Sequence, residues 1–333
     1  MPTDPRRYAE ILHGFAHQRV LVIGDLMLDE FIWGKVSRIS PEAPVPVVSV
    51  TGESYYPGGA ANVARNLREF TPHTSLMGLV GADPQGAKLC GLLQASGIDT
   101  AGVQQDAACS TIVKTRIIAR HQQVVRVDRE RLAPLTPAQL GRAQEYLEAA
   151  MATVDGVVVA DYGKGFLNQQ LAETICQTAL AHGKVITVDP HPHTSLVWTG
   201  ATAVKPNRLE AFNAAGMPLS EPIEPPTEDR PLLDAARKLR RTWNTGSLLV
   251  TLGEQGMLLF HGDAPPYHTP TAAREVFDVS GAGDTAIALF TLGLLAGATP
   301  YEAAELANRA SGIVVGKLGT ATVSRAELEA SLG

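Results

Sequence analysis

Residues 278–285, DVSGAGDT, lead directly into an apolar segment, residues 286–298 (AIALFTLGLLAGA), and this junction indicates the kind of fold. The apolar segment predicts a buried helix, and residues 275–279 form a β-like stretch before it. The two glycines therefore mark a loop that opens a helix. Free backbone N–H groups in the first turn of such a helix point toward an anion that approaches the glycines. The segment is typical of α/β proteins that bind phosphate.

Signals for helices and signals for strands also alternate along the rest of the chain. Helix signals lie at residues 60–70, which place apolar side chains on one face, and at Asp83, Thr136 and Thr299, each an N-cap residue followed by proline. Short apolar runs of strand length recur at residues 20–23, 76–80, 157–160, 185–188, 248–252 and 257–260. Strands alternating with helices predict an α/β fold that is doubly wound, with a mostly parallel sheet and helices on both faces.

Two stretches interrupt this alternation. Residues 29–56 are rich in β-branched residues, prolines and turns, and residues 113–127 show an extended pattern without a helix between its halves. We expect one domain over residues 1–333, with a small β lid inserted from about residues 30–57 and 110–128. A lid would exclude water, which competes as acceptor in group transfer. The alternative is a pair of surface hairpins without such a role.

Composition excludes several classes of protein. The 333 residues carry 28 basic and 34 acidic side chains, a net charge of −6, which argues against nucleic-acid binding by phosphate neutralisation. The apolar run is shorter than the roughly 20 residues that cross a bilayer, and no apolar signal core opens the chain. Three scattered cysteines form no disulfide framework, which favours the cytoplasm. Residues 221–229, acidic and rich in proline, are interpreted as a solvated connector.

Within residues 278–285, two kinds of group needed for phosphoryl transfer stand side by side. The backbone of Gly281, Ala282 and Gly283 would donate to the migrating phosphoryl group, and Asp284 would accept the proton of the attacking hydroxyl. The alternative is a helix cap in which Asp284 is a charge favoured by the helix dipole.

Two further segments suit a polyhydroxylated ligand. Gly58 and Gly59 precede a helix and permit close approach, and Asn62 can both donate to and accept from vicinal hydroxyls. Asp25 and Asp29 follow the first strand, at the edge where open α/β sheets bind ligands. A tight turn in the first segment and a turn cap in the second remain the alternatives.

A fourth segment, residues 205–210 (KPNRLE), places Asn207 and Glu210 in one helical turn. Such oxygen ligands suit water-mediated Mg²⁺ binding, and a capping box is the alternative. Residues 312–318 imitate a P-loop, but the glycine spacing is one residue short and Leu318 replaces the required Ser or Thr. No GxGxxG motif follows the first strand, which disfavours a dinucleotide oxidoreductase.

Taken together and in this order, the four segments resemble those of the ribokinase-like (pfkB-type) carbohydrate kinases, with Ser280 in place of the commoner threonine. The resemblance implies a ribokinase-like fold, ATP as phosphoryl donor, Asp284 as catalytic base, and Mg²⁺ held through Asn207 and Glu210. It also implies a K⁺ ion near Asp278 and a homodimer formed through the lid. The resemblance places the adenine near Thr251, Gly253, Gly256 and Asn308.

A narrower resemblance, to the bacterial heptose-7-phosphate kinases, rests on residues 37–48, 122–128, 161–165 and 315–320. It implies phosphorylation of D-glycero-D-manno-heptose 7-phosphate at O1 in lipopolysaccharide synthesis. Many such kinases are fused to an adenylyltransferase with an HxGH-type motif. This chain contains no such motif, so it resembles the kinase half, and we expect a separate protein to perform the adenylylation.

A phosphorylated sugar requires cations near the lid, because arginine and lysine bind phosphate oxygens. We expect the acceptor to be bound by Asp25, Asp29, Gly58, Gly59, Asn62, Arg38, Lys114, Arg116 and Lys164. For the lid cations the alternative is ordinary exposed strand charge that prevents edge aggregation. For the whole chain the alternatives are a pfkB-type kinase of another sugar or sugar phosphate, and a non-catalytic sugar- or nucleotide-binding regulator. No nucleic-acid or membrane partner is expected.

Overall fold

The structure, a computed structural model, describes residues 5–120, 122–192, 194–273, 276–317 and 319–332. The strands of its larger sheet are β1 (Val20–Gly24), β4 (Thr74–Gly81), β5 (Asp99–Asp106), β8 (Gly156–Ala160), β9 (Val185–Asp189), β10 (Ala203–Val204), β11 (Ser247–Thr251), β12 (Met257–His261) and β13 (Tyr267–Thr269). Within the described ranges these nine strands are ordered β13-β12-β11-β10-β9-β8-β1-β4-β5. All neighbouring pairs from β11 to β5 in this order are parallel, whereas β12 is antiparallel both to β11 and to the edge strand β13.

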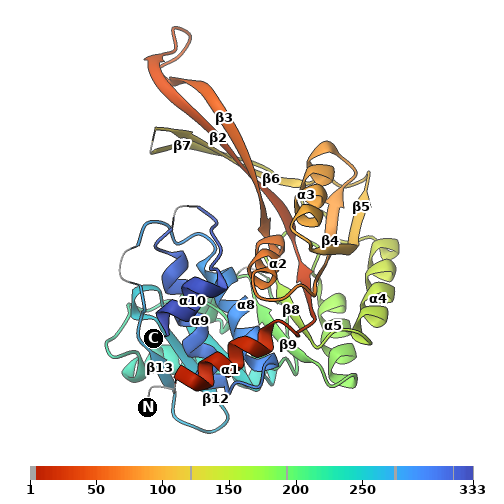
Figure 1. Ribbon diagram of the computed structural model, residues 1–333, viewed down its shortest axis with the longest axis vertical. Helices are drawn as coiled ribbons and strands as arrows, with labels where there is room; N and C mark the ends of the chain where they lie inside the picture. Colours follow the sequence, from red (N-terminus) through yellow and green to blue (C-terminus); the bar gives the residue numbers. More distant parts are fainter. Residues whose placement is uncertain (1–4, 121, 193, 274–275, 318, 333) are drawn as a thin grey trace.

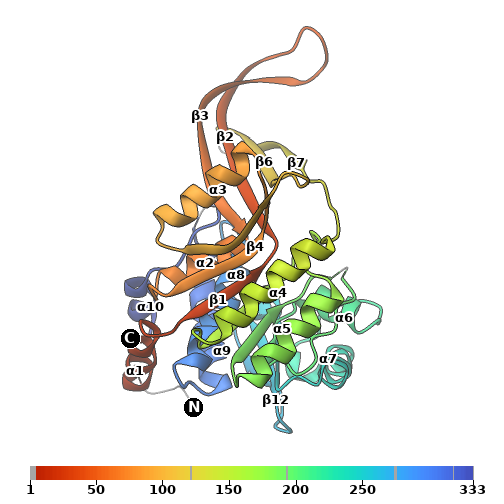
Figure 2. The ribbon, with the colours of Figure 1, turned by 90° about the vertical axis from the view of Figure 1, so that its right-hand side faces the viewer.

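Helices cover both faces of this sheet (Figures 1 and 2). Their bounds are α1 (Pro5–Phe15), α2 (Ala60–Arg68), α3 (Pro84–Ala95), α4 (Pro137–Met151), α5 (Gln169–Ala181), α6 (Arg208–Ala214), α7 (Arg230–Trp243), α8 (Ala282–Leu295), α9 (Pro300–Val314) and α10 (Arg325–Ser331), with short 3₁₀ turns at Pro226–Glu228 and Gly253–Gln255. The predicted N-caps Asp83, Thr136 and Thr299 each accept a hydrogen bond from the first turn that follows. These helix starts are confirmed, and the six apolar runs predicted as strands correspond to β1, β4, β8, β9, β11 and β12.

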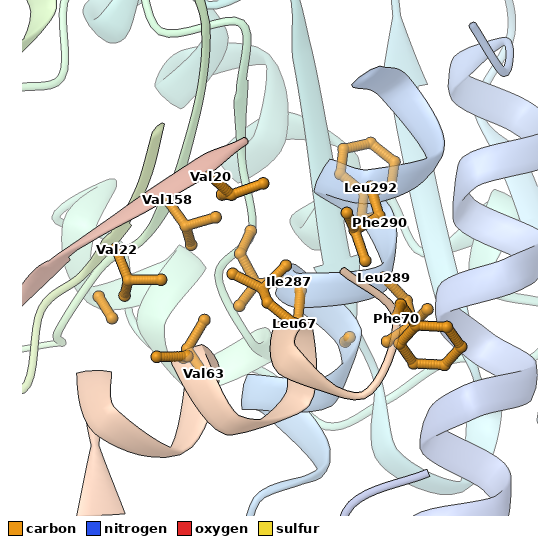
Figure 3. Close-up of a cluster of buried hydrophobic side chains, with 14 of the residues drawn as sticks. Val20, Val22, Val63, Leu67, Phe70, Val158, Ile287, Leu289, Phe290 and Leu292 are labelled. Atoms are coloured by element: carbon orange, nitrogen blue, oxygen red, sulfur yellow. The ribbon is translucent and has the colours of Figure 1, made fainter. Parts of the chain in front are cut away.

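Side chains along the central strands point alternately to the two faces of the sheet, so the core consists of two clusters. In β1, Val20 and Val22 pack under α2 and α8 on one face, while Leu21 and Ile23 pack under α4 and α5 on the other. Figure 3 shows the first cluster, in which Val63 and Leu67 of α2 meet Ile287 of α8 above β1. Parallel strands buried on both faces require such continuous apolar runs.

A second sheet stands apart from the first. Strands β2 (Leu26–Ile39), β3 (Pro46–Gly59), β6 (Ile112–Ala119) and β7 (Gln122–Arg129) form it, in the order β3-β2-β6-β7 within the described ranges. We call it the small sheet. Its hairpin of β2 and β3 projects well beyond the body of the molecule (Figure 1). The two segments that interrupt the α/β alternation are therefore the ones that build this sheet.

Two expectations are corrected. Residues 276–279 are not a strand, because the backbone N–H groups of Phe277 and Asp278 donate to the carbonyl of Val315, after α9, rather than to a sheet edge. Glu275 lies outside the described residues. The connector at residues 221–229 is mostly exposed, as expected, but Asp229 at its end is fully buried and forms an ion pair with Arg208.

The topology decides where the site lies. Because β1, β8, β9, β10 and β11 are parallel, the residues that follow them meet at the same edge of the sheet. The first turn of α8 and the base of the small sheet lie at this edge. In the described ranges, no helix has both the length and the apolarity that crossing a membrane requires.

Candidate active site

The site is centred on residues 278–285, which we call the glycine turn. Gly281 caps α8 in the left-handed conformation, with φ of 82°, a backbone geometry that favours glycine. The turn sends the chain directly into α8, so the N–H groups of Gly283 and Asp284 lie in a first turn that has no helical acceptors for them. The predicted set of amide donors and the carboxylate of Asp284 therefore share one helical turn.

Asp284 is held by two side chains from distant parts of the chain. Asn62 Nδ2 donates to its Oδ2 at 2.6 Å, and the Tyr162 hydroxyl donates to its Oδ1 at 2.5 Å. Burial raises the pKa of Asp284 to about 6, and the two hydrogen bonds oppose that rise. A carboxylate with this pKa is ionised at neutral pH and is a stronger base than an ordinary aspartate.

The predicted glycine pair lies at the end of β3, directly before α2. A Cβ atom on Gly58 would lie 2.3 Å from Asp29 Oδ2, and one on Gly59 would lie 2.6 Å from the carbonyl oxygen of Asp25. The glycines thus let the small sheet approach the core closely. Asn62 is buried, and the structure shows it supporting Asp284; its contact with a sugar stays a prediction.

Asp25 is also buried, at 2% exposure, and it anchors a loop. Its two carboxylate oxygens accept the backbone N–H groups of Tyr162, Lys164 and Phe166, each at 3.0 Å. Burial raises the pKa of Asp25, and these three hydrogen bonds act against it. Its role as a sugar ligand stays a prediction, while the structure shows that it fixes the loop carrying Tyr162.

Cations gather where the small sheet meets this loop. Arg116 pairs with Asp29 at 2.5 Å, and Lys164 pairs with Glu130. Lys114 lies beside Asp29 in the register of β2 and β6, and in the described part of the chain it has no carboxylate within ion-pair distance. Burial, and then the charge of Lys164, lowers the pKa of Lys114. Lys114 is therefore a half-buried cation that Asp29 and Asp128 attract from neighbouring strand positions but that forms no direct ion pair in the described residues.

Arg38 does not join this cluster. It pairs with Val47 near the tip of the projecting hairpin, nine positions beyond Asp29 in β2. At about 3.3 Å per residue the intervening strand spans roughly 30 Å. The prediction that Arg38 binds the acceptor is therefore wrong within a single chain, because β2 is a long, continuous strand.

A cavity of about 480 Å³ opens on the other side of the glycine turn. Its walls include the Ala282–Gly283 end of α8 and apolar side chains such as Met257 and Val279. The four residues expected near the adenine, Thr251, Gly253, Gly256 and Asn308, all line it. The structure thus brings them together next to the amide donors.

Asn207 and Glu210 form a reciprocal capping box at the start of α6. Asn207 Oδ1 accepts the N–H group of Glu210 at 2.9 Å, and Glu210 Oε2 accepts that of Asn207 at 2.7 Å. This was one of the two alternatives for the pair. Burial raises the pKa of Glu210, against the attraction of Lys205. In the described residues no three His, Cys, Asp or Glu side chains are grouped to hold a metal, so Mg²⁺ binding stays a prediction.

Asp278 joins the glycine turn to the loop at residues 319–322. Its carboxylate accepts the N–H group of Ser280 at 2.9 Å and that of Gly319 at 3.1 Å. Burial would raise the pKa of Asp278, but the hydrogen bonds from Ser280 and Gly319 bring it below its usual value. The hydroxyl oxygen of Thr320 in this loop is buried, and no described residue forms a hydrogen bond with it.

The sequence analysis missed Tyr162, Asp189 and Lys205. Lys205 pairs with Asp189 at 2.9 Å, and a Cβ on Gly283 would lie 3.5 Å from its Nζ, so its charge stands beside the amide donors. Burial lowers the pKa of Lys205, but Asp189 and Glu210 raise it above its usual value. The rule used for Asp25, polar residues at the ends of parallel strands, also applies to these three residues.

Known proteins resemble this chain over most of its length. A model of the pfkB family of carbohydrate kinases matches residues 17–327. A bifunctional protein HldE of Magnetococcus marinus is 45% identical over 328 residues, 96% of this chain and 64% of the relative. The chain thus spans less than two thirds of the length of that relative.

Two solved structures share the fold at lower identity. Phosphofructokinase-2 of Escherichia coli, solved with substrates and products, has a TM-score of 0.75 and 19% identity, covering 95% of this chain and 98% of that one. Ribokinase of Arabidopsis thaliana, solved with ribose and ATP, has a TM-score of 0.69 and 17% identity, with the same coverage of 95% and 98%.

Proposed function

Because this chain belongs to the pfkB family of carbohydrate kinases, we propose that it transfers the γ-phosphoryl group of ATP to O1 of D-glycero-D-manno-heptose 7-phosphate. The product would be the 1,7-bisphosphate, an intermediate of ADP-heptose and lipopolysaccharide core synthesis. The resemblance to heptose-7-phosphate kinases and the 45% identity to a protein named HldE support this acceptor.

One observation carries the proposal: Asp284 directly follows Gly283 in the cavity wall, and its carboxylate contacts Asn62, one of the residues expected to hold the sugar. The cavity reaches Gly283, and Asn62 at the base of the small sheet touches the carboxylate. A nucleotide in the cavity would present its terminal phosphate to the first turn of α8, where amides and the dipole favour negative charge. Asp284 would then face both reactants.

The reaction proposed for these residues is a direct transfer. Asp284 takes the proton from the O1 hydroxyl as the bond from O1 to the γ-phosphorus forms. The bond from that phosphorus to the bridging oxygen breaks, and its electron pair remains on ADP. The amides of the glycine turn and the ammonium of Lys205 stabilise the charge on the moving group.

The residues present fit two metal ions. Glu210 retains a carboxylate oxygen with no partner in the described residues, and one carboxylate together with waters and ATP phosphates is an ordinary Mg²⁺ environment. Mg²⁺ would neutralise phosphate charge there. The buried hydroxyl oxygen of Thr320, which has no hydrogen-bond partner among the described residues and lies beside Asp278, suits a K⁺ ion that would stabilise the glycine turn.

A phosphate on the acceptor accounts for the cations at the small sheet. Arg116 and Lys164 have carboxylate partners, whereas Lys114 has none in the described residues, and all three belong to the set expected to bind the acceptor. A phosphate on the acceptor would give Lys114 a direct ionic partner, which an unphosphorylated sugar would not. The site therefore favours a sugar phosphate.

The proposal also covers the cellular compartment and the oligomeric state of the protein. Its cysteines are free, and its substrates are small phosphorylated molecules, which agrees with a cytoplasmic enzyme. The exposed apolar side chains of the small sheet favour a homodimer formed through it, with the sheet acting as a lid.

The purified chain, supplied with ATP, Mg²⁺ and a panel of acceptors, tests the proposal through ADP release. We expect heptose 7-phosphate to be preferred over fructose 6-phosphate and ribose. The Asp284→Asn variant should lose about 10²–10⁴-fold in kcat while it still binds ATP, because the general base is lost and the cavity is retained.

Comparable activity on ribose or fructose 6-phosphate would overturn the heptose assignment and point to another sugar kinase. Near-normal turnover by Asp284→Asn would overturn its role as base. Binding of sugar and nucleotide without any ADP release would instead identify a regulator.

A further inference from the structure

Tyr162 lies at the centre of the site without a role in the proposed reaction. Its hydroxyl donates to Asp284 Oδ1 at 2.5 Å, on the opposite carboxylate oxygen from Asn62. Burial, and then the negative charge of Asp284, raises the pKa of Tyr162, so that the phenol stays protonated and can act only as a donor here. Each carboxylate oxygen has one bound donor, which leaves a second lone pair for an acceptor hydroxyl.

The loop that carries Tyr162 is held unusually firmly. Asp25 Oδ2 accepts the backbone N–H groups of both Tyr162 and Lys164, and Asp161 Oδ1 accepts that of Gly163 at 2.8 Å. Thr194 donates to the second oxygen of Asp161 at 2.5 Å. Asp25 and Thr194 thus tie this loop to two other parts of the chain, and Asp161 braces it from within.

The charges around Asp284 explain why such a donor matters. Asp189 at the end of β9 repels the ionised carboxylate, and Lys205 after β10 attracts it. Asp29 on β2 acts on Tyr162 from the side of the small sheet. In the described residues Asn62 and Tyr162 are the side chains that hydrogen-bond to the carboxylate itself.

We propose that Tyr162 is a positioning residue, which orients the Asp284 carboxylate toward the acceptor and keeps it ionised as the site closes around it. The inference rests on the proposed function in taking Asp284 as the base. Asp25 would support this role indirectly, because its carboxylate accepts backbone N–H groups of the loop that carries Tyr162.

The test compares the wild-type chain with Tyr162→Phe, which keeps the ring and removes only the hydroxyl. The aspartate carboxyl carbons are labelled with ¹³C, and the Asp284 signal is assigned by its loss in Asp284→Asn. In the wild type we expect Asp284 to titrate near pH 6. Without the hydroxyl, the charged form loses a donor, so the pKa should rise by about one unit.

Kinetics provide the second readout. Since the base works only when ionised, kcat falls as pH drops through the pKa of Asp284. In Tyr162→Phe this acidic limb should move upward by about one pH unit, giving a roughly tenfold loss at pH 5.5 that is largely recovered at pH 8.5. Tyr146→Phe, a partly buried tyrosine on α4, is the matched control and should leave both measurements unchanged.

An unmoved Asp284 titration overturns the proposal, and so does a loss of kcat by the same factor at every pH, which indicates mere structural damage. If the wild type phosphorylates no acceptor, the proposed function fails separately. The carboxyl titration needs no substrate and still decides whether Tyr162 controls Asp284.

Discussion

At the scale of single residues, the site keeps charged side chains buried, where hydrogen bonds and neighbouring charges stabilise them in place of water. Asp284 is an aspartate whose pKa is raised to about 6 by burial, while two neutral donors keep its charged form accessible. Lys205 is a buried lysine that keeps its charge because acidic groups surround it. Such opposed environments are characteristic of catalytic centres.

Lys114 provides a residue-scale prediction. The Lys114→Met variant should raise KM for heptose 7-phosphate by roughly 10–100-fold, because a charge-assisted hydrogen bond to the phosphate is lost. Activity on an unphosphorylated acceptor should change little. The measurement is a set of initial rates on both acceptors.

Lys88→Met is its matched control, because Lys88 lies on α3 and packs its ammonium 3.3 Å from the centre of the Tyr55 ring instead. Equal losses with the two acceptors, or an equal effect of Lys88→Met, would contradict the assignment of Lys114 to the phosphate.

At the scale of elements, α6 and α7 are joined by a buried ion pair. Arg208 at the start of α6 donates to Asp229, the N-cap of α7, at 2.7 Å, and Asp229 is fully buried. The same carboxylate accepts the N–H group of Leu232 at 3.2 Å. The pair therefore ties the start of α6, where Asn207 and Glu210 lie, to the start of α7.

The Asp229→Ala variant should lower the free energy of unfolding by about 3–5 kcal/mol, since it leaves a guanidinium without its partner. Urea denaturation measures the change. Asp234→Ala in α7 is the control: its pair with Arg237 is exposed, and its loss should cost less than about 1 kcal/mol. Similar losses in the two variants would show that burial is not the cause.

Sequence patterns predicted local elements better than distant contacts. The run at residues 20–23 and the caps at Asp83, Thr136 and Thr299 have signals within a few positions of each other. The contact of Asn62 with Asp284 joins positions 222 residues apart, and no local pattern encodes it. The four residues expected near the adenine, which line the cavity, were predicted from the family resemblance and not from sequence periodicity.

The errors have equally physical causes. Residues 276–279 have strand composition but find no strand to pair with, so they bond to the end of α9. Arg38 has suitable chemistry, but the length of β2 carries it away from the site. The composition of a segment indicates only which secondary structure it prefers. Whether a strand finds a partner, and how far it extends, depends on the assembled fold.

At the scale of the whole molecule, the small sheet presents apolar surface that a solitary chain would leave in water. Large exposed side chains on it include Trp33, Val45, Val50, Val125 and Val127. Exposed strand edges with such side chains favour pairing with another sheet. We expect a homodimer, with twice the mass of the 35.3 kDa chain in gel filtration with light scattering.

The double variant Val50→Lys/Val125→Lys should elute as a monomer, because two charges would be buried at the interface. Leu180→Lys, an exposed leucine on α5 away from the small sheet, is the control and should leave the mass unchanged. A wild-type protein of 35.3 kDa in solution would refute the dimer.

Strand β3 passes into α2 without an intervening loop: it ends at Gly59, and α2 begins at Ala60, two residues before Asn62. The hairpin and the amide that donates to Asp284 are therefore continuous in the backbone. A displacement at the base of β3 would carry Asn62 with it, so we expect the position of the small sheet and the orientation of the carboxylate to depend on each other.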